Sequence, residues 1–219
     1  MTWSELRVKC RRQSDYIITL FITNEISLCI TWLLIRTRIT PNQVTLASIF
    51  CGFLCAGFYA NGNFFAGSLF LFFSHALDCT DGNLARAKEM FSSLGRWLDM
   101  FGDRFSEAIV FMGIGFYFFK MGESSWVLLS LITGILLLLY YYIVDISLTL
   151  GMSKPIQKIG KWQFKGVHVK WGIMEPMIYG FIILSSLGLI KVQLVLLVML
   201  TLTGLFYQGI KVLYREKKV

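Results

Sequence analysis

The chain has 219 residues, of which 56% are hydrophobic and 16% aromatic, and its mean hydropathy is +0.64. This composition excludes an ordinary soluble domain and indicates a protein that crosses a membrane several times. The net charge of +8 does not indicate a nucleic-acid partner, because the basic residues flank hydrophobic segments and would attract anionic lipid headgroups and phosphorylated substrates instead.

The first hydrophobic segment, residues 17–36, is interrupted in its middle by Asn24, Glu25 and Ser27. Such a pattern suits an amphipathic helix at the membrane interface, and a first crossing with Glu25 buried is the alternative. Thr40 and Pro41 follow this segment. A threonine cap with proline at the first helical position is a normal helix start, so we expect a new helix there.

Six further apolar segments are long enough to cross a hydrocarbon layer of about 30 Å as helices. They cover residues 44–60, 64–87, 94–119, 126–150, 173–190 and 192–213. Strand-like alternation of polar and apolar residues is absent from them, which disfavours a membrane barrel. The sequence therefore predicts an all-α integral membrane protein, a bundle of six transmembrane helices preceded by an interfacial amphipathic helix.

We expect residues 1–219 to form one membrane domain. Its parts would be a cytoplasmic segment with the interfacial helix at 1–40, the six helices at 41–213 and a basic tail at 214–219. All but two of the 21 Lys and Arg, Lys120 and Lys191, fall on one side of this arrangement. Because basic residues accumulate in cytoplasmic loops, we expect a multi-pass protein of the cytoplasmic membrane with both termini in the cytoplasm.

Four aspartates interrupt this hydrophobic pattern, and charged side chains at membrane depth are costly, rare and usually functional. They are Asp78, Asp81, Asp99 and Asp103. The first two share one helical face with small residues, and the last two form a second stripe with Gly95. The short connection between the two helices predicts an antiparallel hairpin. The four carboxylates can therefore meet near the cytoplasmic mouth.

Four carboxylates with no cluster of histidine or thiolate ligands suit Mg²⁺, Mn²⁺ or Ca²⁺ better than zinc or copper. Two such ions about 3.5 to 4 Å apart would neutralise the four charges and form a clamp for phosphoryl transfer. Arg86, one turn past Gly82, is placed to bind a phosphate. Structural Asp–Arg pairing is disfavoured because four carboxylates face one nearby arginine. We interpret His75 as a packing residue or an indirect neighbour of the site.

Together these residues spell DxxDGxxAR, then eight residues, then GxxxDxxxD. The pattern resembles the signature of the CDP-alcohol phosphotransferases (CDP-alcohol phosphatidyltransferases of class I), membrane enzymes that move a substituted phosphate from a CDP-linked donor to an alcohol and release CMP. The resemblance favours the interfacial interpretation of residues 17–36 and implies a homodimer. The positions that carry it are Asp78, Asp81, Gly82, Ala85, Arg86, Gly95, Asp99 and Asp103.

The resemblance also implies roles for individual residues. Asp78 and Asp99 would bridge two divalent cations, Mg²⁺ or Mn²⁺, and Asp81 would complete one of the two sites. Asp103 would bind the other cation and act as general base. The remaining implied contacts are to the nucleotide part of the donor, from Gly82, Arg86, Asn42, Gln43, Val44 and Thr45, with Ser92 as a weaker candidate.

The acceptor alcohol is less clearly indicated. Residues 98–104, LDMFGDR, resemble the branch that uses inositol phosphate, yet the loop 153–171 offers five lysines where that branch has arginines. We expect a donor such as CDP-diacylglycerol and an acceptor such as inositol phosphate or glycerol phosphate, for phospholipid biosynthesis. A membrane prenyltransferase and a cation- or proton-coupled transporter are the alternatives, and metal-dependent release of CMP distinguishes the enzyme from both.

Overall fold

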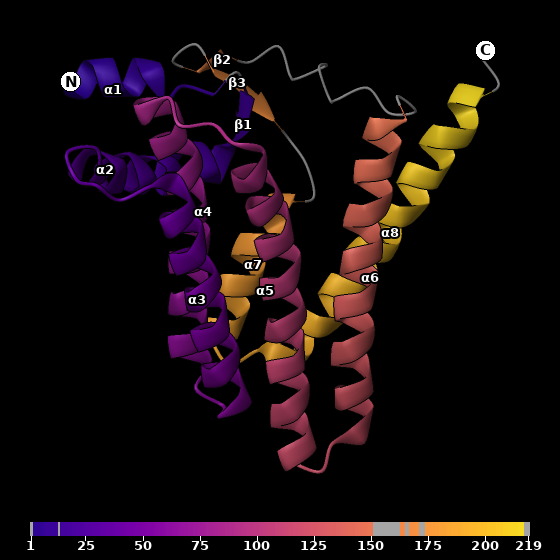
Figure 1. Cartoon of the computed structure of the whole chain (residues 1–219). Coiled ribbons are helices and arrows are strands. Elements are labelled where there is room, and N and C mark those ends of the chain that lie inside the picture. The colour runs from indigo at the N-terminus through magenta and orange to yellow at the C-terminus, as the bar shows by residue number, and fades with distance from the viewer. Residues whose placement is uncertain (1, 13, 151–162, 165–166, 171–173, 217–219) are drawn as a thin grey trace.

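The computed structural model describes residues 2–12, 14–150, 163–164, 167–170 and 174–216. These residues form mainly helices, and the long ones run side by side in a bundle (Figure 1). The elements in chain order are α1 (Trp3–Lys9), β1 (Ser14–Tyr16), the π-helix η1 (Thr19–Thr23), α2 (Asn24–Leu34), α3 (Pro41–Ala60), α4 (Phe64–Lys88), α5 (Ser93–Lys120), α6 (Ser124–Thr149), β2 (Gln163–Phe164), β3 (Val167–Lys170), α7 (Met174–Ser186) and α8 (Ile190–Glu216).

Both chain ends lie at the same end of the bundle (Figure 1). We call this the motif end, because the aspartate motif lies near it: α3 begins there at Pro41, α4 ends there at Lys88 and α5 begins there at Ser93. Helix α3 begins at this end as predicted: the Thr40 hydroxyl accepts from the amide of Gln43 (3.4 Å), and Gln43 Oε1 accepts from the amide of Thr40 (2.9 Å). Pro41 occupies the first helical position, where a missing N–H removes no bond.

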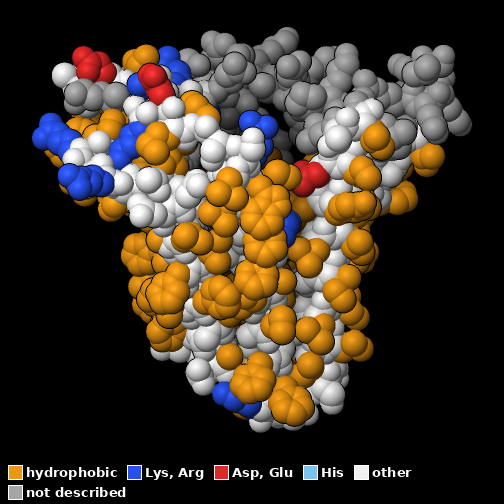
Figure 2. Space-filling view, viewed as in Figure 1, with side chains coloured by type: hydrophobic (Ala, Val, Ile, Leu, Met, Phe, Trp, Pro, Cys, Tyr) orange, Lys and Arg blue, Asp and Glu red, His pale blue; other side chains and the backbone are white. Residues whose placement is uncertain are grey.

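Three of the described helices are long and apolar enough to cross a membrane, at Pro41–Ala60, Ser124–Ser147 and Ile190–Lys211. The chain is therefore a multi-pass membrane protein. Figure 2 shows hydrophobic side chains over the middle of the visible face and charged ones gathered at the motif end. At the far end, Lys120 donates to the carbonyl of Ala60 (3.3 Å), and Lys191 pairs with Glu123 (2.5 Å).

Helices lie at all six predicted segments, but α7 is shorter than expected. The prediction spans residues 173–190, whereas α7 ends at Ser186. The chain turns there because Gly188 adopts a positive φ of 74°, a conformation that glycine permits at little cost. The 13 residues of α7 are about 20 Å long at 1.5 Å per residue.

The N-terminal part lies across the motif end and does not run alongside the bundle (Figure 1). The expected first segment folds as η1 followed by α2. Leu6 and Cys10, at and just after α1, pack with Leu28 and Ala87 in a small apolar cluster. Glu25 is partly exposed and forms an ion pair with Arg7, so it is not the isolated buried charge that a first crossing would require.

A three-stranded sheet joins the N-terminal segment to the chain before α7. Strand β1 pairs with β3 in parallel, with Ser14 opposite His168 and Tyr16 opposite Lys170, and β2 pairs with β3 in antiparallel. The prediction included only helices. Strands of two to four residues are too short to show the period-2 pattern by which strands are recognised.

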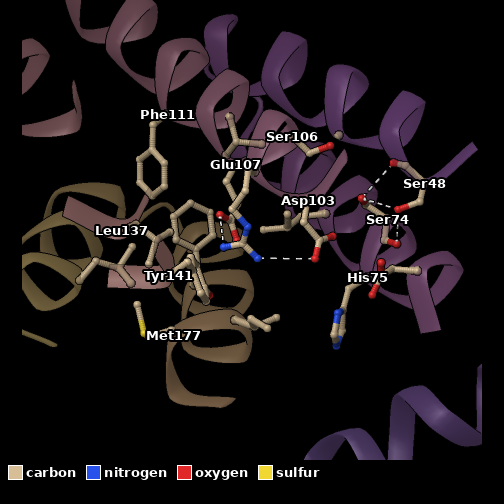
Figure 3. Close-up of a pocket in the computed structure, with 18 residues that line it drawn as sticks. Ser48, Ser74, His75, Asp103, Ser106, Glu107, Phe111, Leu137, Tyr141 and Met177 are labelled. Carbon is tan, nitrogen blue, oxygen red and sulfur yellow. Dashed lines mark hydrogen bonds and ion pairs between the residues drawn. The ribbon is translucent and has the colours of Figure 1, made fainter. Parts of the chain in front are cut away.

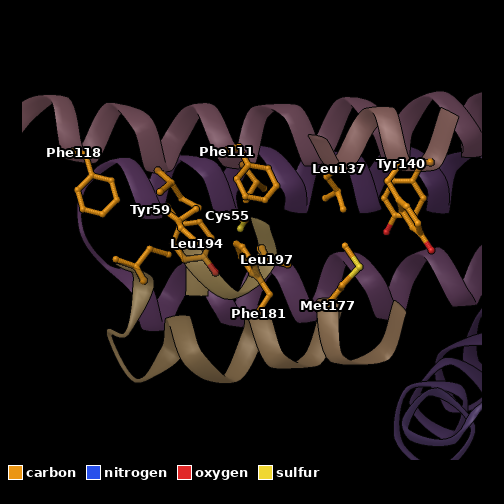
Figure 4. Packing of buried hydrophobic residues seen from close by; sticks show 14 residues of the cluster. Cys55, Tyr59, Phe111, Phe118, Leu137, Tyr140, Met177, Phe181, Leu194 and Leu197 are labelled. Carbon is orange, nitrogen blue, oxygen red and sulfur yellow. The ribbon is translucent and has the colours of Figure 1, made fainter. Parts of the chain in front are cut away.

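The main core lies between α3, α5, α6, α7 and α8 (Figure 4). Tyr59 of α3 is fully buried in it, and its hydroxyl hydrogen-bonds Ser185 of α7 at 2.8 Å. Helix α3 packs against both α4 and α5, which make few contacts with each other. The two arms of the expected hairpin therefore pack on α3 and hardly on each other.

Gly113 on α5 allows the close approach of α3. A Cβ atom at this position would lie 2.4 Å from the carbonyl oxygen of Ala56. We expect Gly113→Ala to destabilise the protein by about 1 to 3 kcal/mol, because the two helices must move apart. Gly57→Ala is the matched control, since a Cβ there meets nothing within 4 Å. Thermal unfolding in detergent measures both, and equal melting temperatures would contradict the close packing.

Candidate active site

The structure brings together the aspartates of α4 and α5. Carboxylate oxygens of Asp78, Asp81 and Asp99 lie within 4.8 Å of one another. Asp78 and Asp81 lie one turn apart on α4, so their side chains leave the helix on the same face, toward α5. Three carboxylates at this separation repel one another strongly, and a cation that they share would remove the repulsion.

Asp103 lies one turn beyond Asp99 on α5. Its carboxylate is 3.5 Å from Nη2 of Arg104. With Asp78, it lines a cavity of about 260 Å³ that extends from the aspartates into the bundle (Figure 3). Asp103 is thus the aspartate that faces this inner cavity from α5.

A hydrogen bond from α3 orients Asp81. The hydroxyl of Thr45 donates to Oδ2 of Asp81 at 2.5 Å, and both residues are buried. Thr45 lies one turn inside the helix start that Thr40 and Pro41 define. The entrance of α3 therefore fixes one carboxylate of the cluster.

We expect Thr45→Val to lower the affinity for a divalent cation about 10- to 100-fold, because a ligand that loses its supporting hydrogen bond is less well oriented. The change keeps the shape of the side chain. Thr203→Val is the control, since Thr203 is exposed and, among the described residues, its hydroxyl donates only to the carbonyl of Met199 within its own helix. Titration of Mn²⁺ or Mg²⁺ against activity measures the effect, and equal metal affinity in the two variants would contradict it.

A second cavity, of about 330 Å³, opens between the start of α3, the end of α4 and the start of α5. We call it the entrance cavity. Five of the seven residues expected to contact the nucleotide line it, and Gln43 and Val44 do not. The lining residues are Pro41, Asn42, Thr45, Asp81, Gly82, Ala85, Arg86, Met90, Phe91, Ser92, Gly95, Arg96 and Asp99.

Two glycines shape the entrance cavity in different ways. A Cβ at Gly82 would meet only the guanidinium of Arg86, at 3.6 Å, so this face of α4 is open. A Cβ at Gly95 would lie 2.7 Å from Oδ1 of Asn42. Gly95 therefore allows the start of α3 to approach α5, and Gly82 leaves room for a ligand.

Arg86 is held in place from the N-terminal part of the chain. Its Nη2 donates to Oδ1 of Asn83 (2.6 Å), and Nδ2 of Asn83 donates to the hydroxyl of Ser27 on α2 (2.6 Å). Nε of Arg86 is buried and has no hydrogen-bond partner among the described residues. Helix α2 thereby orients a cation at the wall of the entrance cavity.

Residues 38–206 match the family model described as CDP-alcohol phosphatidyltransferase. The chain belongs to the CDP-alcohol phosphatidyltransferase family. It is thus a CDP-alcohol phosphotransferase, and this assignment decides against the prenyltransferase and the transporter. All four aspartates and the entrance cavity lie within the matched residues, whereas α1, β1, η1 and α2 lie outside them.

Individual relatives agree with this assignment. An uncharacterized protein of Aquifex aeolicus (strain VF5) is 28% identical over 185 residues, 84% of this chain and 85% of that protein. A phosphatidylinositol phosphate synthase of Streptomyces avermitilis is 33% identical over 95 residues, which are 42% of this chain and 38% of that enzyme.

Solved structures share the fold. The Mycobacterium tuberculosis phosphatidylinositol phosphate synthase with CDP-DAG bound superposes with a TM-score of 0.66 at 22% identity, over 87% of this chain and 93% of that one. The same synthase in complex with manganese and citrate gives a TM-score of 0.67 at 22% identity, over 87% and 88% of the two chains.

The inner cavity of this CDP-alcohol phosphotransferase contains an ion pair that the sequence did not reveal. Nη1 of Arg104 is 3.0 Å from Oε2 of Glu107, and its guanidinium carbon lies 3.6 Å from the ring centre of Tyr141. Asp103, Glu107 and Tyr141 surround the same part of the cavity (Figure 3). The spacing of Arg104 and Glu107, three residues apart on a helix, could have indicated this ion pair. Nothing in the sequence distinguishes Tyr141 from the tyrosines on either side of it.

His75 lies next to the cluster, as one turn of separation from Asp78 suggests. Its ligand atom is within 4.8 Å of those of Asp78 and Cys79, and Nε2 is 3.4 Å from the hydroxyl of Tyr179. Its interpretation as an indirect neighbour of the site stays a prediction. Of the five loop lysines considered for the acceptor, Lys154, Lys158, Lys161 and Lys165 lie outside the described residues, and Lys170 is described only as part of β3.

Proposed function

We propose that this enzyme transfers a phosphatidyl group from CDP-diacylglycerol to the hydroxyl of a phosphorylated polyol and releases CMP. Inositol phosphate is the first candidate acceptor, and glycerol phosphate is the second. The observation that carries the proposal is the meeting of Asp78, Asp81 and Asp99 within 4.8 Å beside a cavity that also contains Arg86. The synthases among its relatives and the LDMFGDR segment support the inositol phosphate branch.

The site fits two divalent cations, Mg²⁺ or Mn²⁺. Carboxylate oxygens are the ligands these hard ions prefer, and the short separation of Asp78, Asp81 and Asp99 suits ligands that share ions. Asp103 would complete the set. When bound, the ions would stabilise the negative charge that develops on the diphosphate and on the departing CMP. The manganese complex of the M. tuberculosis synthase supports this proposal.

Asp103 is the proposed general base. Its carboxylate takes the proton of the acceptor hydroxyl, which is a poor nucleophile at neutral pH. The acceptor oxygen then bonds to the β-phosphorus while the bond from that phosphorus to the bridging oxygen breaks, and CMP leaves with that oxygen. Arg86, Gly82, Asn42 and Ser92 would hold the nucleotide in the entrance cavity, with Gln43 and Val44 supporting the start of α3.

The proposed topology has six crossings, α3 to α8, in one domain over residues 1–219, preceded by α2 at the interface. The motif end would face the cytoplasm, because the charge distribution places all but two of the Lys and Arg on that side. The parts are those expected from the sequence, namely 1–40, 41–213 and 214–219. We also propose a homodimer in the cytoplasmic membrane.

The test is release of CMP by purified protein given CDP-diacylglycerol and a panel of acceptors. The panel contains inositol phosphate, glycerol phosphate, serine, inositol and ethanolamine, each with Mg²⁺, with Mn²⁺ and with a chelator. We expect metal-dependent release with a phosphorylated polyol. Release with serine or ethanolamine alone would refute the proposed acceptor class. Absence of release with every acceptor would indicate a donor other than CDP-diacylglycerol.

A further inference from the structure

Arg12 reaches the aspartate cluster although it belongs to the N-terminal segment that precedes the matched residues 38–206. Two anchors hold this segment. The thiol of Cys10 donates to the carbonyl of Asn83 on α4 (3.3 Å), and β1, which begins at Ser14, pairs with β3. Arg12 lies between these anchors, so its position is fixed from both sides.

The guanidinium of Arg12 contacts residues at the edge of the cluster. Nη1 is 3.6 Å from Oδ2 of the buried Asp15. The guanidinium also lies near enough to the thiol of Cys79 and the carboxylate of Asp78 to interact with both electrostatically. Ligand atoms of Cys79 and Asp78 lie within 4.8 Å of each other. The cation is therefore next to one of the proposed metal ligands.

Arg12 and Arg86 stand close enough to repel each other. Both guanidinium groups are charged, because arginine does not lose its proton in proteins. Two divalent cations would neutralise the four site carboxylates, leaving Asp15 as the acidic partner of two arginines. Like charges in such a place are costly unless an anion lies near them.

The two arginines face different cavities. Arg86 lines the entrance cavity, and Arg12 is not among the described residues that line it. Arg12 instead lines a separate cavity of about 80 Å³, whose other charged residues are Arg7, Arg11, Asp15 and Glu25. Because Arg86 lines the cavity proposed for the nucleotide, we expect it to bind the diphosphate of the donor. Arg12 is then available to bind a second phosphate.

We propose that Arg12 binds the phosphate of the acceptor, which makes the N-terminal segment part of the substrate site. The inference rests on the proposed transfer to a phosphorylated alcohol. A guanidinium presents five N–H donors in a planar fork and can hold a phosphate with two hydrogen bonds while one edge keeps its carboxylate partner. Asp15 would be that partner, and the anchors at Cys10 and β1 would keep the fork in place.

The test compares Arg12→Gln and Arg12→Lys with Arg38→Gln, which removes the same charge from an exposed residue that lines none of the three cavities. Steady-state release of CMP gives the KM for inositol phosphate at saturating CDP-diacylglycerol, and the KM for the donor at saturating acceptor. We expect Arg12→Gln to raise the acceptor KM about tenfold or more, the scale of one lost charge-assisted hydrogen bond. Arg12→Lys should raise it less, because the charge remains. The donor KM of the Arg12 variants, and both constants of Arg38→Gln, should stay unchanged.

A second readout does not depend on turnover. With Mn²⁺ present, inositol phosphate should raise the melting temperature of the wild-type protein and of Arg38→Gln, and not that of Arg12→Gln. If Arg12→Gln does not fold, both the KM values and the melting temperatures are measured on Arg12→Lys. This variant keeps the positive charge and loses the planar guanidinium donors.

The outcomes separate this inference from the proposed function. An unchanged acceptor KM in an Arg12→Gln enzyme overturns the inference while the wild-type activity stands. A rise in the donor KM alone assigns Arg12 to the diphosphate and also overturns it, as does a lower kcat or melting temperature with both KM values unchanged. A wild-type enzyme that releases no CMP with any phosphorylated acceptor removes the proposed function, and the inference with it.

Discussion

The Asp103→Asn variant should lose turnover and keep most of its affinity for the CDP-linked donor. We expect release of CMP to fall about 10²- to 10⁴-fold, the usual contribution of a positioned general base. Asparagine has nearly the same shape as aspartate but cannot accept the proton of the acceptor hydroxyl. Asp103 lines the inner cavity and not the entrance cavity, so the donor site should persist.

Asp145→Asn is the matched control for this variant. Asp145 is an exposed residue of α6 and lines none of the three cavities described above. Release of CMP gives turnover, and the change in melting temperature on adding the donor gives binding. Wild-type turnover in Asp103→Asn would place the general base on another residue, and loss of donor protection would mean that Asp103 acts mainly as a metal ligand.

Features set by local rules were predictable from the sequence. The cap formed by Thr40 and Pro41 depends on neighbouring residues only, and the structure has it as expected. The meeting of the aspartates follows from helical spacing within α4 and α5 and from the short connection between them. In both cases the relevant residues lie within a few positions of one another or on consecutive helices.

The structure separates the four residues from Asn42 to Thr45, for which a nucleotide contact stays a prediction. The resemblance assigned all four residues to the nucleotide, but a helix presents residues three apart on one face. Asn42 and Thr45 line the entrance cavity, while Val44 is buried and Gln43 caps the helix. Helical geometry applied to the motif would have made this distinction.

Contacts between distant parts of the chain gave no local signal. Arg12 lies near Cys79 only because the segment between α1 and β1 packs against α4, and Arg104 stacks on Tyr141 only because α5 packs against α6. The pairing of β1 with β3 joins residues about 150 positions apart in the sequence, and hydrophobic periodicity reports only local structure. These contacts surround the aspartate cluster, and they are what the structure adds to the sequence prediction.

Asp99→Asn should abolish activity. It should also have a higher melting temperature than the wild type without metal and a lower one with metal. Without metal, oxygens of Asp78, Asp81 and Asp99 lie within 4.8 Å and repel one another. Removing one charge relieves part of this repulsion, so the metal-free variant should melt at the higher temperature. Asp145→Asn again serves as the control, and its melting temperature should follow that of the wild type.

With Mn²⁺ or Mg²⁺ present, the wild-type protein should gain stability that the variant cannot. Binding to the folded state alone adds about 2.7 kcal/mol when the free ion is at 100 times its Kd, and Asp99→Asn lacks a carboxylate that the proposed ions would share. Thermal unfolding with increasing metal, and then with a chelator, measures the reversal. If metal raised both melting temperatures equally, the cation would be bound elsewhere, and the charge of the aspartate cluster would have to be balanced by Arg12 and Arg86 instead.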